Sequence, residues 1–99
     1  MLVHSVYFWL KEELSDRERA DFRAGLEGLA GIPEVERVFV GTPAETPPRP
    51  VIDDSYTFGL VVLLPGLAEH DVYQQHPLHQ QFLARFKDDW ERVQVYDVV

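Results

Sequence analysis

LVHSVYFWL, at residues 2–10, is the stretch of sequence that decides the fold of this chain. It is rich in β-branched and aromatic residues, it is too short for a typical helix, and charge follows it, so it predicts a strand. Because side chains alternate along a strand, the run divides between two faces. These faces carry Val3, Tyr7 and Trp9 on one side and His4, Val6, Phe8 and Leu10 on the other. Both faces of the strand are therefore apolar.

A second run with the same property, SYTFGLVVLL, occupies residues 55–64 and predicts another buried strand. Between the two runs, Ser15 and Glu18 form a capping-box pattern that predicts the start of a helix. Apolar residues continue that helix at helical spacing, and Gly31 and Pro33 end it. The residues of this apolar stripe are Phe22, Leu26 and Leu29.

The other segments complete an alternating order of strands and helices. They are a strand at 35–41, a proline-rich loop at 42–54, a helical segment at 67–74, a helix from Pro77 to about Trp90 and a strand at 93–98. The order β-α-β-β-α-β predicts one α+β domain over residues 1–99, with a ferredoxin-like, four-stranded antiparallel sheet. In that topology the first and third strands lie in the middle of the sheet, where their apolar character fits.

Two helices can cover only one face of such a sheet, so the other face would leave large apolar side chains in water. A second copy packed sheet against sheet removes this exposure, and the pattern therefore predicts a homodimer. The alternative is that the proline-rich loop at 42–54 folds over the open face of its own sheet.

Composition excludes several classes of function. The chain has 99 residues, no cysteine and a formal charge of −8, which disfavour thiolate chemistry, nucleic acid and an anionic membrane surface. The longest strongly apolar stretch, Phe58 to Leu64, is far shorter than a bilayer requires. The first residues lack a basic region and a small-residue cleavage site, so we expect no signal peptide and a cytoplasmic location.

Histidines are the candidates for chemistry. His76 and His79 stand three residues apart near Glu69 and Asp71, but no established metal-binding pattern accompanies them, and we expect neither a metal nor a cofactor. Because His76 precedes a proline at a helix start, it is expected to hydrogen-bond local backbone.

Tyr73, His79 and His4 form a second group of candidates. If Tyr73 and His79 meet at the mouth of a cavity between the sheet and the second helix, the imidazole can take a proton from a carbon acid while the phenol stabilises the oxyanion. His4 lies on an otherwise apolar strand face, where it is either a hydrogen-bonded core residue or part of the pocket.

The chain resembles the stress-responsive A/B barrel (Dabb) domain family of the dimeric α/β-barrel superfamily. The resemblance rests on the opening strand with His4, the segment from Tyr73 through His76-Pro77-Leu78-His79 and the closing Val95-Tyr96-Asp97. It implies a ferredoxin-like subunit that pairs into a barrel. One similar plant branch contains a polyketide cyclase whose catalytic tyrosine and histidine correspond to Tyr73 and His79, with a pocket histidine at His4 and another histidine where this chain has Phe58.

On this basis we expect Tyr73 and His79 as candidate catalytic residues, and His4, Phe8, Phe58 and His76 as residues that contact a ligand. Three functions are compatible with the sequence. The first is a homodimeric barrel that binds a small apolar, aromatic or polyketide-like ligand. The second is a lyase or cyclase that performs intramolecular aldol chemistry with Tyr73 and His79. The third is a structural or assembly module.

Overall fold

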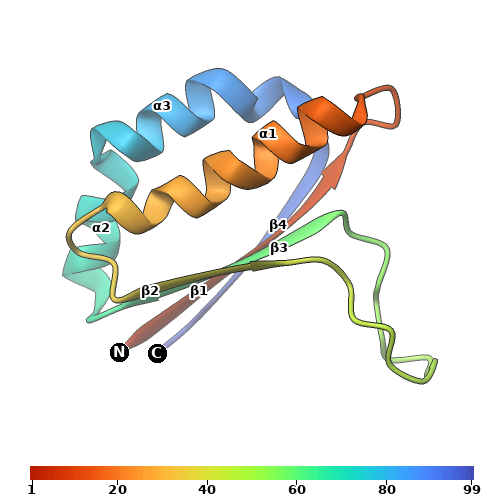
Figure 1. Ribbon diagram of the computed structural model, residues 1–99. Coiled ribbons are helices and arrows are strands. Elements are labelled where there is room, and N and C mark those ends of the chain that lie inside the picture. The colour runs from red at the N-terminus through yellow and green to blue at the C-terminus, as the bar shows by residue number, and fades with distance from the viewer.

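The apolar run at the start of the chain forms β1, and the remaining elements follow the predicted order (Figure 1). The computed structural model describes residues 1–99. Its elements are β1 (Leu2–Leu10), α1 (Asp16–Glu27), β2 (Arg37–Gly41), β3 (Phe58–Leu64), α2 (Leu67–Gln75), α3 (Pro77–Phe86) and β4 (Trp90–Val98). Short 3₁₀ turns follow α1 at Gly28–Gly31 and α3 at Lys87–Asp89.

The four strands form one antiparallel sheet in the order β2-β3-β1-β4. The two most apolar strands, β1 and β3, therefore lie in the middle. Val6 of β1 pairs with Leu60 on one side and with Val95 on the other. This arrangement confirms the predicted ferredoxin-like α+β fold.

The expected bounds of two elements near the C-terminal end were wrong. The helix that begins at Pro77 ends at Phe86 and not near Trp90, and the last strand begins at Trp90 and not at residue 93. The reason is tertiary pairing. Trp90 pairs with Leu10 across the sheet, and Lys11 N donates to Asp89 O at 2.9 Å, so these residues belong to the sheet although their local pattern is helical.

The second and third strands are also shorter than expected, because β2 begins at Arg37 and β3 at Phe58. The proline-rich connection therefore extends over residues 42–57. Asp53 accepts hydrogen bonds from Ser55 N at 3.0 Å and from the Ser55 hydroxyl, and this local turn replaces strand pairing just before β3.

The first helix begins as its capping box predicts. Glu18 N donates to Ser15 Oγ at 3.1 Å, and Ser15 N donates to Glu18 Oε1 at 3.0 Å. The two bonds satisfy backbone donors that a helix start otherwise leaves open. The helical spacing then places Phe22 and Leu26 in the core, and Leu29 follows them in the 3₁₀ turn. No helix of the chain is both long enough and apolar enough to cross a bilayer.

The core lies between the helices and the face of the sheet that they cover (Figure 1). Every second residue of β1 and β3 is buried there. Aromatic rings from α1 and α3 complete this core: Phe22, Phe82 and Phe86. Each fully buried side chain of this size contributes roughly 1.5–3 kcal/mol relative to an exposed one.

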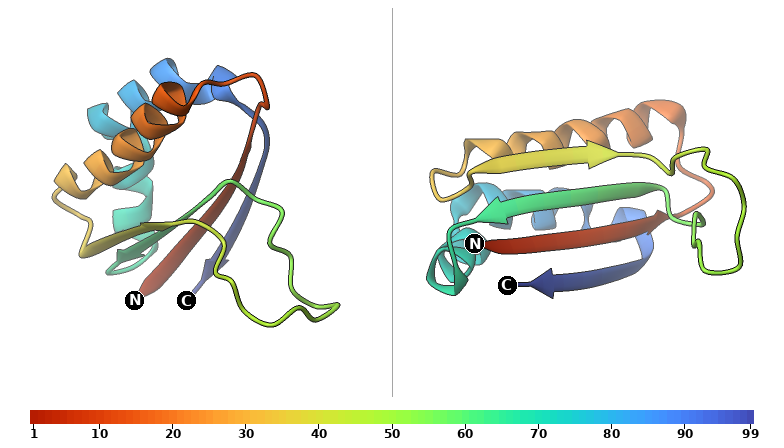
Figure 2. Two further views of the ribbon diagram at one scale, coloured as in Figure 1. Left: turned by 45° about the vertical axis from the view of Figure 1, so that its right-hand side comes forward. Right: turned by 90° about the horizontal axis from the view of Figure 1, so that it is seen from below.

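The opposite face of the sheet has no covering layer (Figure 2). Large apolar residues remain on it, including Phe39 at 60% and Tyr96 at 59% exposure. The proline-rich loop leaves the sheet at one end and projects beyond it (Figure 2). Only its last residues reach the face, where Tyr56 packs against Tyr7 and Ser55 Oγ accepts a hydrogen bond from Trp9 Nε1 at 2.9 Å. The loop therefore does not close this surface, which we call the open face.

Gly25 offers a test of how closely the two long helices pack. A Cβ added at this position would lie 2.4 Å from Cε2 of Phe86. We expect Gly25→Ala to lower the free energy of unfolding by about 1–3 kcal/mol, because the ring must move within a filled core. Urea denaturation at a fixed protein concentration measures this change.

Gly28→Ala is the matched control for this substitution. Gly28 has a helical φ of −63°, and a Cβ there would meet no heavy atom within 4 Å. Its substitution is expected to raise the free energy of unfolding by about 0.4–1 kcal/mol. Equal stabilisation by the two substitutions would contradict the close helix contact.

Candidate functional site

A cavity of about 210 Å³ lies between the sheet and helices α2 and α3. Ten of its thirteen lining residues are hydrophobic, and the three polar ones are His4, Gln74 and His79. Val93 and Val95 of β4 form its more exposed wall, each with 42% exposure. This composition, apolar with a few polar groups, is typical of small-molecule sites.

His76 and Pro77 place the two helices that line the cavity. The chain turns from α2 into α3 at His76, which has extended backbone and therefore ends one helix and precedes the next. Its Nδ1 accepts a hydrogen bond from Leu78 N at 3.1 Å, as expected of a histidine before the proline of a helix start. The result is that Tyr73 from α2 and His79 from α3 approach each other, with ring centroids 4.9 Å apart.

His79 is the most unusual polar group in the structure. Its side chain is buried. Among the buried nitrogen and oxygen atoms of all side chains, only its Nδ1 lacks a hydrogen-bond partner. Burial lowers the pKa of His79, and the nearby imidazoles of His4 and His70 lower it further. The ring is therefore neutral near pH 7 and offers one unprotonated nitrogen.

Tyr73 has the opposite character. Its side chain is 1% exposed, and this burial raises the pKa of Tyr73 above its ordinary value. The phenol therefore keeps its proton and acts as a hydrogen-bond donor. A neutral imidazole beside a protonated phenol is an arrangement suited to proton transfer and oxyanion stabilisation.

His4 faces the cavity from the central strand. Its Nδ1 donates a hydrogen bond to Asp97 Oδ1 at 2.5 Å, because the antiparallel register sets the two residues directly opposite each other on β1 and β4. The carboxylate accepts only, so it holds the proton on Nδ1 and leaves Nε2 of a neutral ring as an acceptor. The ring centroid of His4 lies 5.7 Å from that of Tyr73.

The predicted ligand contacts divide into two groups. Phe8 and His4 line the cavity together with Tyr73 and His79. Phe58 and His76 are not among its lining residues. Phe58 stacks on Phe22 in the core, with ring centroids 6.0 Å apart, and His76 caps α3.

Asp97 and Gln74 were not among the residues predicted from sequence. Asp97 stands in a strand whose neighbours are apolar, and only the pairing of the first strand with the last brings it to His4. Gln74 follows Tyr73 on α2, and its role depends on which side of that helix meets the sheet. No local sequence signal marks either residue as part of a site, although Asp97 belongs to the closing segment on which the family resemblance rests.

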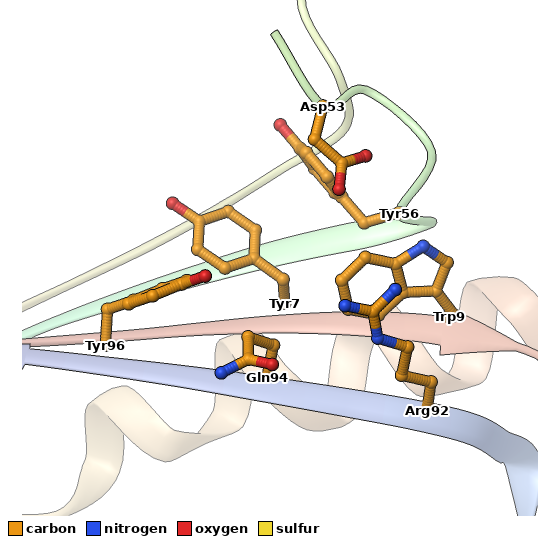
Figure 3. Close-up of a pocket in the computed structure, with 7 residues that line it drawn as sticks. All are labelled: Tyr7, Trp9, Asp53, Tyr56, Arg92, Gln94 and Tyr96. Atoms are coloured by element: carbon orange, nitrogen blue, oxygen red, sulfur yellow. The ribbon is translucent and has the colours of Figure 1, made fainter. Parts of the chain in front are cut away.

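A second hollow, of about 290 Å³, lies on the open face (Figure 3). Tyr7, Tyr56 and Tyr96 gather there, with the rings of Tyr7 and Tyr56 4.9 Å apart. The Arg92 guanidinium lies 4.1 Å from the centroid of Trp9, a cation–π contact. These groups largely interact with one another, and no unpaired histidine is present among them, so the cavity under the helices is the stronger candidate for chemistry.

The fold and this cavity define a class: a small ferredoxin-like α+β domain with a histidine–tyrosine cavity between its sheet and its helices. Residues 2–99 match the family model described as the stress responsive A/B barrel domain, Dabb. The chain belongs to this family, which confirms the resemblance inferred from the sequence. A search of curated proteins gave no match.

Solved structures with the same fold include proteins of known and unknown activity. A Dabb family protein with a ferredoxin-like fold from Mesorhizobium loti is 26% identical, with a TM-score of 0.80 over 99% of this chain and 94% of that one. A dimeric ferredoxin-like protein of unknown function from Thermobifida fusca is 21% identical, with a TM-score of 0.80 over 99% and 89%. A hydroxynitrile lyase from Passiflora edulis is 21% identical, with a TM-score of 0.81 over 98% and 90%.

The lowered pKa of His79 predicts how stability depends on pH. In the unfolded chain this histidine titrates near its ordinary pKa of 6.5, whereas burial lowers its pKa in the folded state, which resists protonation. Stability is therefore complete above about pH 6.5 and falls as the pH drops below it, by at most about 1.4 kcal/mol per pH unit for this group. We expect His79→Gln to reduce this loss between pH 8 and pH 5.5, as measured by urea denaturation.

His76→Asn is the control for this experiment, because asparagine retains a cap for α3 and His76 lies outside the cavity. The control should keep the pH dependence of the parent protein. The explanation is contradicted if His79→Gln and the parent lose the same stability on acidification.

Proposed function

We propose that this protein is a homodimer whose subunits each bind a small aromatic or polyketide-like molecule in the cavity between sheet and helices. The observation that carries the proposal is the unpartnered, buried Nδ1 of His79 in a cavity that is otherwise mostly apolar. A buried polar atom without a partner costs about 1–3 kcal/mol, which a hydrogen-bonding ligand would offset.

The lining indicates what such a ligand carries. Phe8, Phe82 and Trp90 offer flat apolar walls, which suit an aromatic ring. A hydroxyl group is the matching polar substituent, because it both donates and accepts and so pairs with either nitrogen of the neutral His79 ring. Tyr73 supports the binding of a carbonyl, since its protonated phenol is a donor.

A second candidate function is catalysis by the same pair, and the 4.9 Å separation of the Tyr73 and His79 rings favours it. The neutral imidazole would take a proton from a carbon next to a carbonyl group, and the phenol would donate a hydrogen bond to the enolate oxygen. In aldol chemistry that carbon then bonds to a second carbonyl carbon of the same molecule, and the proton returns to the new alkoxide. The Passiflora edulis hydroxynitrile lyase supports the idea that this fold accommodates lyase chemistry.

Binding is tested by NMR titration with resorcinol, a phenol with one ring and two hydroxyls. Saturable shifts of the His79 and Tyr73 side-chain signals are expected for the parent protein. Leu83→Trp should abolish them, because Leu83 lines the cavity and the larger side chain fills it. Leu67→Trp, on the exposed side of α2, is the control and should bind as the parent does.

Equal binding by the two tryptophan variants, or no saturable shift in the parent, would count against the cavity as the site. Catalysis is read in the same proteins as exchange of the α-protons of phenylacetone in deuterated water. Catalysis requires proton exchange faster than in buffer alone, and His79→Gln must lose it. Binding of resorcinol without such exchange would support the ligand-binding function and contradict catalysis.

Pairing of two subunits is supported by the open face. Val3, Val61, Leu63 and Val98 are among its apolar side chains, and a single chain provides nothing that covers them. The dimeric state of the Thermobifida fusca protein supports the same arrangement. In such a pair the aromatic hollow of Tyr7, Tyr56 and Tyr96 would lie between the two sheets.

Sedimentation equilibrium at micromolar concentration should give twice the chain mass of 11.5 kDa. Val61→Glu places a charge on a central strand of the open face, and it should give the mass of one chain, because burying an unpaired carboxylate between sheets is costly. Val51→Glu, at an 81% exposed loop position, should remain dimeric. A monomeric parent protein would contradict the pairing.

A further inference from the structure

Three potential metal ligands from distant parts of the chain meet beside the cavity. They are His4 on β1, His70 on α2 and Asp97 on β4, and one ligand atom from each lies within 4.8 Å of the other two. His70 and Asp97 do not line the cavity, so the cluster shares His4 with the cavity but does not include Tyr73 or His79.

The fold brings these side chains together for reasons of register and helical spacing. His4 and Asp97 are directly paired across two antiparallel strands. His70 lies three residues before Tyr73 on α2, so the two share the side of the helix that faces His4. The ring centroids of His4 and His70 are 5.1 Å apart, and those of His4 and Tyr73 are 5.7 Å apart.

We propose that His4, His70 and Asp97 bind a divalent cation of the zinc class. Two imidazoles and one carboxylate are a ligand set that Zn²⁺ uses, and imidazole favours Zn²⁺ and its transition-metal neighbours over Mg²⁺ or Ca²⁺. Three protein ligands leave at least one coordination position for water or for another molecule.

One buried and two partly exposed side chains suit this role. Metal bonds of about 2.0–2.2 Å bring tetrahedral ligand atoms to roughly 3.3 Å from one another, so the cluster must contract on binding. His4 is held in the buried face of the central strand and provides a fixed position. The side chains of His70 and Asp97 are 19% and 42% exposed, so both have room to move toward it.

Charge also favours a cation at this place. The carboxylate of Asp97 has His4 as its ion-pair partner, and no lysine or arginine pairs with it. His70 approaches a second carboxylate, that of Asp71, with 3.6 Å between Nδ1 and Oδ1. A cation between His4 and Asp97 replaces the proton that their hydrogen bond now holds and adds a bond to His70.

This site differs from the one considered from the sequence, where His76 and His79 were the paired imidazoles. In the structure His76 caps α3 with its Nδ1, and His79 belongs to the cavity. The histidine that joins His4 is His70, six residues earlier than His76. The proposal does not depend on which organic ligand occupies the cavity.

The test is titration of chelator-treated protein with ZnCl₂ by calorimetry, and with CoCl₂ by visible absorption. We expect one ion per chain and Co²⁺ bands of the intensity that four- or five-coordinate sites give. His70→Gln and Asp97→Asn should each weaken Zn²⁺ binding by at least about tenfold, since each removes a ligand. His76→Asn is the matched control and should bind Zn²⁺ as the parent does.

Circular dichroism establishes that each variant is folded, and the two ligand variants provide independent tests if one of them is not. The proposal is overturned if the parent protein shows no saturable binding, if neither ligand variant weakens it, or if His76→Asn weakens it as much. Repeating the resorcinol titration with EDTA present separates this proposal from the cavity function, because cavity binding should survive removal of the metal.

Discussion

Central strand β1 is apolar on both faces, and this requirement for cover on two sides shapes the rest of the molecule. On one face, Val6, Phe8 and Leu10 pack against aromatic rings from α1 and α3. On the other face, Tyr7 and Trp9 lie on a surface that no part of the chain closes. The helices and the proposed second subunit both answer the same physical cost, that of leaving a two-sided apolar strand in water.

The cavity arises from incomplete cover on the helix side. α1 and α3 lie over the β2, β3 and β1 side of the sheet, whereas β4 at the edge has neither of these helices above it (Figure 2). Its inward-facing Val93 and Val95 are accordingly 42% exposed. Into this gap α2 and α3 direct Tyr73 and His79, and β1 directs His4. The strand and helices that carry these polar groups also contribute residues to the hydrophobic core. That core therefore holds the polar groups in position.

Much of the fold could be predicted from sequence, because strand alternation, the Ser15 capping box and the break at Pro77 are local signals with a direct physical meaning. The proximity of Tyr73 and His79 was also foreseeable, since they are only six positions apart, with one helix break between them. The roles of Asp97 and His70 were not, because they depend on the register between the first and last strands and on the rotation of α2. Trp90 illustrates the same limit: its neighbours are helical in pattern, but its pairing with Leu10 makes it part of a strand.

The strict alternation of buried and outward-facing residues in β1 limits where the chain can gain or lose a residue. Along this strand each residue faces either the helices or the open face, and its neighbour faces the other. Insertion or deletion of one residue in β1 would reverse the facing of every residue on one side of the change, so that core-facing and outward-facing side chains there would exchange places. Homologues should therefore vary in length within the proline-rich connection at 42–57, which contains no strand of the sheet. The nine residues of β1 should stay constant in number.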